Sequence, residues 1–399
     1  MPSSTSSSDG AVLPAVAARG AAPAADRYAR HTAADRPGVA QPVPQRPVPA
    51  QPWGRIVLGS VLLLVLLLSA WEKYWRDYGV HPAITNTYGL WAIQRRRIDA
   101  GEGDATVLVG ASRIFFDVQL PEWERLAGKR PIQLSFEGTS PLTAVEDLAE
   151  DAKFTGRLII GVAPDVFFSG FAYRGGAGAY ARKESPSQRI GQWLSMRFIE
   201  PYVAFYDPDF ALGTVLARQP WPLRPGKQRT MAVRKLAETE ADRNTHLWDK
   251  VENDPEYRAI AREVWALDLA PSPDDPPPAE VAKTAQQQID RMAKAVAKLH
   301  ARGVKVLFVR PPSNGIFLET EERVFPRAKT WDVLLRATGA PGIHFQDYPE
   351  LQGFTLPEWS HVAYSQANRF TAALYRIVER DFWGPGAPHA PAAAASPAQ

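Results

Sequence analysis

The chain from residue 87 to residue 377 alternates short apolar runs with stretches that repeat hydrophobic positions at helical spacing. Five runs are rich in Val, Ile or Leu and are bounded by Gly, Pro or a charged residue, as buried parallel strands are: 107–109, 132–136, 158–162, 304–309 and 343–346. Amphipathic helical patterns cover 87–101, 140–154 and 279–303. This alternation predicts an α/β domain with a central parallel sheet of about five strands.

One apolar stretch differs from the others because it has no charged face. The sixteen residues 56–71 carry no charge and are mostly Leu and Val. At 1.5 Å per residue they cover about 24 Å of hydrocarbon, and Trp53, Tyr74 and Trp75 beside them are typical anchors at a membrane interface. The pattern predicts one N-terminal transmembrane helix over 53–75. The alternative is a buried core helix, but such helices rarely lack a polar face so completely.

The charges on either side of this helix predict its orientation. Six arginines and three aspartates precede the uncharged run 56–71, a net charge of +3, whereas the four charged residues in 72–77 cancel. The positive-inside rule keeps the amino terminus in the cytoplasm, so we expect a single-pass protein of the inner (cytoplasmic) membrane with a periplasmic or extracytoplasmic domain. Arg95 to Arg97 argue weakly for the reverse. Cleavage by signal peptidase at 68–70 would require an unusually long leader.

Composition marks the ends of the folded part. Residues 1–52 and 384–399 are rich in Pro, Ala and Ser without an apolar period, so both are expected to be disordered tails. The α/β pattern occupies 76–383. It is interrupted at 169–278 by aromatic-rich and Pro-rich stretches, which predict a mostly helical insertion over one end of the sheet. The glycine run "RGGAGAY" lacks the preceding strand and the following Lys-Ser/Thr of a phosphate-binding loop.

The composition also excludes several partners and chemistries. The net charge of +3 is small for 399 residues and no basic helical face recurs, so nucleic acid is not expected as a partner. The chain has no cysteine, which excludes disulfides and thiol catalysis. Its seven histidines show no metal-ligand spacing, so neither a metal nor another cofactor is expected.

Polar residues follow the predicted strands, at the edge where open parallel sheets bind ligands. They are Ser112, Gly138, Asp165 and Arg310 after the first four strands, and Glu358 and His361 after the fifth. A serine hydroxyl is a weak nucleophile until a base takes its proton, and a histidine oriented by a carboxylate is such a base. The order therefore predicts that Ser112 and His361 face each other. The alternatives are a helix-capping Ser112 and a structural His361.

Three segments resemble the SGNH (GDSL-type) hydrolase superfamily: "VLVGASR" at 107–113, "SFEGTSPL" at 135–142 and Glu-Trp-Ser-His at 358–361. They are more similar to its membrane-anchored envelope branch, which includes proteins of D-alanine transfer to teichoic acids and of alginate acetylation. The resemblance extends over residues 100–168 and 300–380 and leaves out the tails, the anchor and the insertion.

The resemblance implies a flavodoxin-like three-layer sandwich and assigns roles to four residues. Ser112 would be the nucleophile, His361 the base and Glu358 the acid that holds it. The amides of Ser112 and Gly138 would bind the oxyanion of the tetrahedral intermediate, a contact worth about 3 kcal/mol of barrier for each donor.

Two positions depart from the family pattern. The family usually has Asp three residues before the histidine, where this chain has Glu358; Asp347 is the alternative acid. After the third strand, "GVAPDV" lacks the asparagine that normally donates to the oxyanion, and Asn314 in the next loop is the candidate substitute. The candidate substrate-binding residues are Arg113, Arg310 and Trp359. The alternative for either arginine is an ion pair with a carboxylate.

The function expected from these features is that of a serine esterase or O-acyltransferase acting on an acyl group of a cell-envelope glycan or polymer. Its expected partners are the membrane, the acylated polymer and other envelope assembly proteins. A second hypothesis is a catalytically inactive SGNH-like domain that binds a polymer or serves as a scaffold. A third is an anchored esterase for soluble substrates.

Overall fold

The computed structural model describes residues 50–219, 222 and 235–385. The two expected tails therefore lie almost entirely outside the described residues. The chain divides into two units, 1–64 and 65–399, and the second unit contains the α/β domain.

Helix α2 (Trp53–Asp77) is long and apolar enough to cross a membrane, and no other helix in the described part of the chain meets that test. Its apolar side chains from 56 to 68 are exposed to the surroundings. The helix contains the whole predicted span 53–75 and continues for two residues beyond it.

A five-stranded, all-parallel sheet forms the centre of the domain, in the order β2-β1-β3-β6-β7. The strands are β1 (Thr106–Val109), β2 (Ile132–Gln133), β3 (Arg157–Gly161), β6 (Lys305–Arg310) and β7 (Gly342–His344). Each one overlaps one of the five apolar runs, so the predicted parallel sheet is confirmed. Beyond β2, the amides of Leu134 and Phe136 still donate to Leu108 and Gly110, which explains why that apolar run is longer than its strand.

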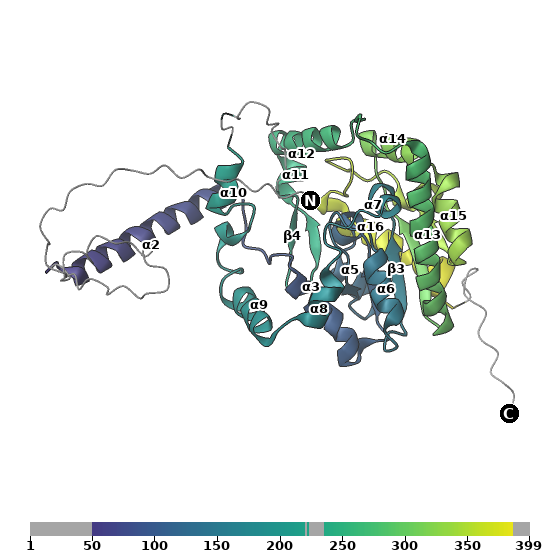
Figure 1. The fold of residues 1–399 in the computed structure, drawn as a ribbon, viewed down its shortest axis with the longest axis horizontal. Helices are drawn as coiled ribbons and strands as arrows, with labels where there is room; N and C mark the ends of the chain where they lie inside the picture. Colours follow the sequence, from purple (N-terminus) through teal and green to yellow (C-terminus); the bar gives the residue numbers. More distant parts are fainter. Residues whose placement is uncertain (1–49, 220–221, 223–234, 386–399) are drawn as a thin grey trace, which may run out of the picture. The chain divides into compact units, whose positions relative to one another are not determined.

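Helices cover both faces of the sheet because successive side chains of a strand point to opposite sides. Val107 and Ile160 belong to one buried cluster, and their neighbours Leu108 and Ile159 belong to the other. The first face is covered by α3 (Tyr88–Arg97), α6 (Leu142–Glu150), α7 (Pro164–Ser169), α13 (Pro278–Ala301) and α15 (Trp331–Thr338) (Figure 1). The second is covered by α4 (Ser112–Asp117), α5 (Leu120–Ala127) and α16 (Tyr364–Ile377).

In its described residues, the segment 169–278 contains several helices and one small antiparallel sheet. Its elements are α8 (Ala177–Lys183), α9 (Pro186–Phe198), η3 (Ala204–Tyr206), α10 (Leu212–Ala217), β4 (Ala237–Thr239), β5 (Thr245–Leu247), α11 (Asp249–Asn253) and α12 (Pro255–Asp268). It has a separate small core, in which Phe210, Trp248 and Tyr257 pack with Trp75 from the end of α2. The insertion is therefore fastened to the start of the domain as well as to the sheet.

The remaining elements are short. They are α14 (Gly315–Val324), the π-helical η2 (Ile98–Glu102) and η7 (Val378–Trp383), and the single 3-10 turns η4 (Arg327–Lys329), η5 (Phe345–Asp347) and η6 (Pro349–Leu351).

Candidate active site

Two glycines allow Ser112 to be presented at the end of β1. The strand ends at Val109, and Ser112 begins α4 three residues later. Ile114 of that helix lies directly over the strand ends, because a Cβ added to Gly161 would be 2.1 Å from Ile114 Cγ1 and one added to Gly110 would be 3.0 Å from Ile114 Cβ. The absence of side chains at these two positions lets α4 approach the sheet. Ser112 is left partly exposed at its first residue.

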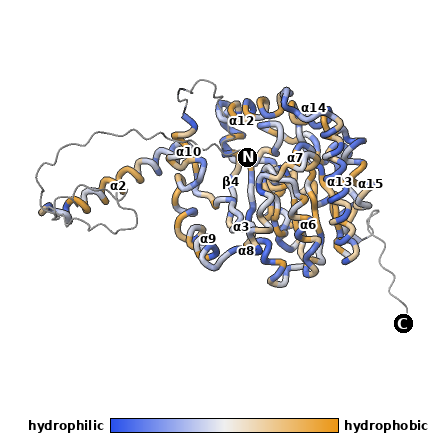
Figure 2. Tube along the Cα trace, viewed as in Figure 1, coloured by the Kyte–Doolittle hydropathy of each residue, from blue (hydrophilic) through white to orange (hydrophobic). Residues whose placement is uncertain are grey.

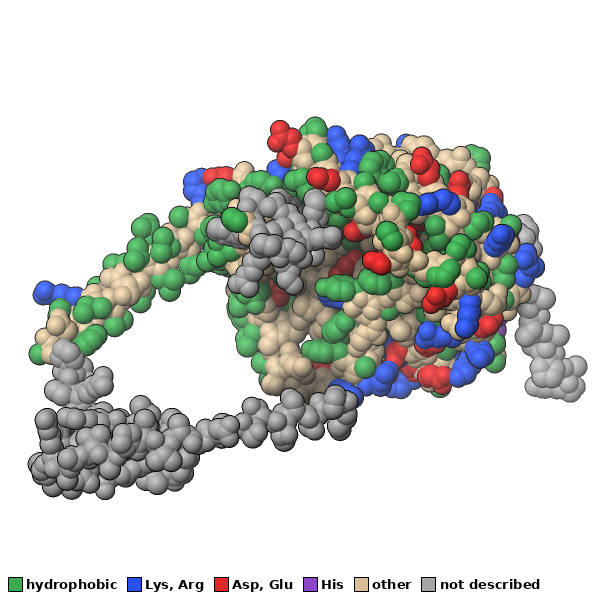
Figure 3. Space-filling model, turned by 45° about the horizontal axis from the view of Figure 1, so that its top comes forward, with side chains coloured by type: hydrophobic (Ala, Val, Ile, Leu, Met, Phe, Trp, Pro, Cys, Tyr) green, Lys and Arg blue, Asp and Glu red, His purple; other side chains and the backbone are tan. Residues whose placement is uncertain are grey.

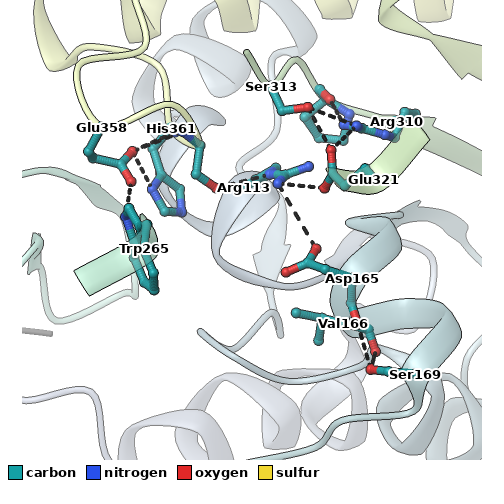
Figure 4. Close-up of polar contacts among 12 residues, drawn as sticks. Arg113, Asp165, Val166, Ser169, Trp265, Arg310, Ser313, Glu321, Glu358 and His361 are labelled. Carbon is teal, nitrogen blue, oxygen red and sulfur yellow. Dashed lines mark hydrogen bonds and ion pairs between the residues drawn. The ribbon is translucent and has the colours of Figure 1, made fainter. Parts of the chain in front are cut away.

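The loop before α16 holds Glu358 and His361 in a buried pair. One carboxylate oxygen of Glu358 accepts hydrogen bonds from Nδ1 of His361 at 2.8 Å and from the His361 amide at 2.7 Å. The other oxygen accepts a bond from the indole of Trp265, in α12, at 2.6 Å (Figure 4). The imidazole is thus oriented from the loop and the carboxylate from the insertion.

The surroundings keep the Glu358 carboxyl ionised. Burial by itself raises its pKa, but the charge of His361 and the hydrogen bonds from His361 and Trp265 outweigh burial and leave the pKa below its ordinary value. An ionised carboxylate can only accept, so Nδ1 of His361 donates to it, and in a neutral imidazole Nε2 would then be the acceptor. Nε2 is buried and, within the described residues, has no hydrogen-bond partner.

Ser112, Gly138 and His361 line one cleft of about 700 Å³. The structure therefore places the early serine and the late histidine in the lining of one cleft at the carboxyl edge of the sheet. In the part of the chain that the structure describes, no hydrogen bond joins the Ser112 hydroxyl to His361. Such contacts are often long in unliganded enzymes and shorten when substrate binds.

Gly138 lies beside this serine with φ +54°, a conformation that favours glycine. Crowding is not the reason, since the nearest atoms to an added Cβ would be 3.8 Å away, on Phe171 and Tyr173. The Gly138 carbonyl accepts a hydrogen bond from the Tyr173 amide at 3.1 Å, so the insertion fixes the turn on one side of the cleft.

Arg113 and Arg310 do not reach the cleft, because both are buried around Glu321 of α14. Arg113 Nη2 lies 2.7 Å from one Glu321 oxygen, and Arg310 Nη2 lies 2.6 Å from the other (Figure 4). Burial raises the pKa of Glu321, but the two guanidinium groups outweigh it and hold the pKa below its usual range. Both arginines therefore form ion pairs with a carboxylate, which was the alternative to substrate binding. Neither is placed to bind substrate in the cleft. Arg113 also donates to the Ser360 hydroxyl at 3.1 Å, which links the serine helix to the histidine loop.

Three other residues named from the sequence lie apart from the serine. Asn314 is exposed, and its amide donates to the Trp359 carbonyl. Trp359 has φ +73° and packs over Gly315, with the Arg262 guanidinium 5.1 Å from its ring. Neither Asn314 nor Trp359 is among the described residues that line the cleft. Asp347 forms an exposed ion pair with Arg327, so Glu358 and not Asp347 is the carboxylate on His361.

Two residues that contact the histidine loop were not predicted from the sequence. Trp265 belongs to the insertion, and nothing in its surrounding sequence marks it. Asp117 ends α4, and one of its oxygens accepts a hydrogen bond from the Val362 amide at 2.9 Å. Burial raises the Asp117 pKa to about 7 despite the opposing charge of His361. An aspartate directly after the apolar run "IFF" was the available signal.

A third residue that was not predicted, Arg243, contacts the chain just before the Gly138 turn. Its guanidinium donates to the carbonyls of Gln133 and Ser135 and lies 4.8 Å and 4.5 Å from the rings of Phe115 and Phe136. Burial lowers its pKa to about 9. The insertion thus supplies a buried cation to the end of β2.

In the described part of the chain, no group of three or more His, Asp or Glu side chains has the arrangement of a metal site. Comparison with protein-family models, with curated proteins and with solved structures finds no match to this chain.

Proposed function

We propose that the protein is a membrane-anchored, SGNH-type serine esterase or O-acyltransferase acting on an acyl group of a cell-envelope glycan or polymer. One observation carries this proposal. Nδ1 of His361 is bound to the buried Glu358 carboxylate, while its unpartnered Nε2 belongs to a residue that lines the same cleft as Ser112.

The proposed reaction passes through an acyl-enzyme. As the Ser112 oxygen attacks the ester carbonyl, Nε2 of His361 takes the hydroxyl proton and the carbonyl oxygen becomes an oxyanion. The amides of Ser112 and Gly138 would bind that oxyanion. His361 then returns the proton to the departing alcohol, which leaves the acyl group on Ser112. Water or an acceptor hydroxyl attacks next, again giving its proton to His361. The bond between the acyl carbon and the Ser112 oxygen then breaks, and His361 returns the proton to that oxygen. Glu358 stabilises each imidazolium.

The strand order also supports the SGNH-type proposal. The order β2-β1-β3-β6-β7 follows the pattern 2-1-3-4-5 of flavodoxin-like sheets, in which ligands bind where the order reverses, between the first and third strands. Ser112 comes directly after β1, at that position. Helices on both faces are in keeping with the three-layer sandwich that the resemblance implies.

The anchor is the reason to propose an envelope substrate. A domain held by α2 reaches molecules that are made at, or exported through, the same membrane. With the charge pattern described above, the proposed location is the inner membrane, with the cleft on the extracytoplasmic side. Other envelope assembly proteins are the proposed partners.

Covalent labelling of the full-length protein with a fluorophosphonate tests the proposal, since the reagent modifies a serine only when a base activates it. We expect one adduct on Ser112 and no adduct in Ser112→Ala or His361→Ala. Ser187→Ala, which changes an exposed serine of α9, is the matched control and should label normally. A folded protein that does not label, or an adduct that persists in Ser112→Ala, would overturn the proposal.

The second candidate function is an inactive polymer-binding or scaffold component, and the missing hydrogen bond between Ser112 and His361 favours it. The two functions differ in whole cells. A scaffold carrying Ser112→Ala would leave the ester-linked acyl content of the envelope polymers unchanged, whereas an enzyme carrying it would change that content.

A further inference from the structure

Helix α9 exposes its large apolar side chains to the surroundings. Ile190, Trp193, Leu194 and Phe198 are all exposed, and no residue of this 13-residue helix is buried. Figure 2 shows hydrophobic positions, in orange, recurring along α9, which lies at the edge of the molecule. An ordinary surface helix of a soluble domain has the opposite arrangement, with its apolar stripe facing the core.

The polar side chains of α9 hold the helix against the domain. Gln192 accepts a hydrogen bond from the Thr87 hydroxyl at 2.7 Å, and Ser195 donates to the buried carboxylate of Glu200. The other oxygen of Glu200 accepts from the Thr85 amide at 2.6 Å. These specific contacts fix which side of α9 faces outward, so its apolar exposure is a built feature of the fold.

The exposed apolar surface continues past the end of the helix. Ile199, Tyr202, Tyr206 and Leu212 are exposed, and together with the four α9 residues they define what we call the outer apolar surface. Single exposed hydrophobic residues are common, but large apolar side chains exposed in this number along one segment suggest a site of protein–protein or membrane contact.

The contacts at the end of α2 favour membrane contact over protein–protein contact for the outer apolar surface. Glu72 accepts hydrogen bonds from the amides of Ala204 at 2.9 Å and Phe205 at 3.2 Å, and Arg76 donates to the Tyr202 carbonyl at 2.9 Å. The uncharged run of α2 ends at Trp71, within about one to two helical turns of these contacts. The boundary of any membrane that α2 crosses therefore lies close to the segment that carries the outer apolar surface.

The charges near this surface suit a bilayer. Between residues 182 and 203 the exposed charged side chains are all basic, while the two acidic residues are buried. The exposed basic residues are Arg182, Lys183, Arg189 and Arg197. Trp, Phe and Leu beside Lys and Arg are the composition of helices that lie in the membrane interface and meet anionic headgroups. In contrast, Figure 3 shows charges of both signs scattered over the part of the molecule that carries α13 and α15.

We propose that the outer apolar surface lies in the interfacial layer of the lipid bilayer that α2 crosses. The domain is then held to the membrane at two places, by the helix and by this surface. The inference rests on α2 as the membrane span and does not depend on the proposed chemistry. The same segment supplies Asp207 and Arg218 to the cleft, so the cleft borders on the membrane-facing part of the insertion.

Because the chain has no cysteine, one engineered cysteine can report on the surroundings of the outer apolar surface. Full-length protein carrying Leu194→Cys with an environment-sensitive fluorophore is placed in vesicles of phosphatidylethanolamine and phosphatidylglycerol. Lys283→Cys, at an exposed position of α13, is the matched control, and Phe198→Cys is a second site on the same surface. At 194 and 198 we expect blue-shifted emission, loss of intensity with brominated lipids and little quenching by iodide. The control should show the reverse.

The proposal would be overturned if labels at 194 and 198 were quenched by iodide as strongly as the label at 283 while the protein still floated with the vesicles. That result would leave the anchor intact and place the surface in water. A second result would also overturn the proposal. The labels would be shielded from iodide only in native membranes and would not be quenched by brominated lipid, which would mean that a protein covers the surface. Fluorophosphonate labelling of Ser112 is read separately, so failure of either proposal is recognisable.

Discussion

Glu358 is the best-satisfied group of the candidate site. Three donors, the His361 ring, the His361 amide and the Trp265 indole, bind its two oxygens within 2.8 Å. A buried carboxylate without such partners would bind a proton. Ionised, it holds the imidazole in one tautomer, which is the state that a general base requires.

At this residue we predict that Glu358→Gln slows fluorophosphonate labelling of Ser112 by about 1,000- to 10,000-fold. The amide can donate to Nδ1 and so favours the wrong tautomer, while the shape of the side chain is kept. Trp265→Phe removes only one hydrogen bond to a charged group and should slow labelling by roughly tenfold. The measurement is the rate of adduct formation, and an unchanged rate in Glu358→Gln would remove Glu358 from the mechanism.

Asp117 predicts a pH dependence of stability. Its pKa is about 7 in the folded protein and about 4 in an unfolded chain. Between these values the folded state binds more protons than the unfolded state, so the free energy of unfolding falls as pH rises through this window and is unaffected below it. Asp117→Asn cannot titrate and removes this loss.

Thermal unfolding of the two proteins from about pH 4 to about pH 8 measures the effect. The midpoint of Asp117→Asn, relative to the unsubstituted protein, should rise across the window and then level off. Other titrating groups cancel in this difference. A difference that is constant with pH would show that Asp117 is not protonated in the folded state.

At the scale of elements, the contact between α4 and the sheet positions the serine. Ile114 occupies the space left by Gly110 and Gly161, and Arg113 ties the same helix to Ser360 in the histidine loop. Packing therefore holds the Ser112 helix against the sheet, and Arg113 holds it to the loop that carries His361.

This arrangement predicts that Gly161→Ala displaces α4. The new methyl group would overlap Ile114 at 2.1 Å, and such overpacking lowers the free energy of unfolding by about 1–3 kcal/mol. Labelling of Ser112 should slow as well. The control is Gly191→Ala in α9, where nothing lies within 4 Å of the added Cβ, and there we expect a gain of about 0.5–1 kcal/mol. Normal stability and labelling of Gly161→Ala in denaturant and fluorophosphonate assays would contradict this packing argument.

At the scale of the whole molecule, the insertion connects the start of the domain to the loop that holds His361. It packs with Trp75 of α2 at one end and supplies Trp265 to Glu358 at the other. The end of α2 is therefore joined to the domain by side-chain packing as well as by the continuous chain.

The charge pattern around α2 predicts the topology of the chain. Gln51→Cys before the helix and Lys283→Cys in α13 form a matched pair, since both positions are exposed and the chain has no other cysteine. In intact spheroplasts a membrane-impermeant maleimide should label position 283 and should label position 51 only after permeabilisation. The reverse pattern would place the amino terminus outside.

Local patterns in the sequence predicted much of this architecture. Runs such as 107–109 and 158–162 identified the parallel strands, because burial on both faces demands continuous apolar residues and leaves a local trace. The three-residue spacing of Glu358 and His361 likewise predicted a pair that the structure shows in contact. The choice between Glu358 and Asp347 could not be made from the sequence, since both precede the histidine on the same connection.

The residue pattern could not show which polar side chains pair with each other across long distances in the sequence. Arg113 and Arg310 follow strands as substrate-binding residues often do, yet packing of α14 brings Glu321 between them. Trp265 reaches Glu358 across 93 positions, and Arg113 reaches Ser360 across 247. Apolar periodicity indicates which side of a helix or strand is buried. Which polar group pairs with a given side chain depends on how distant segments pack.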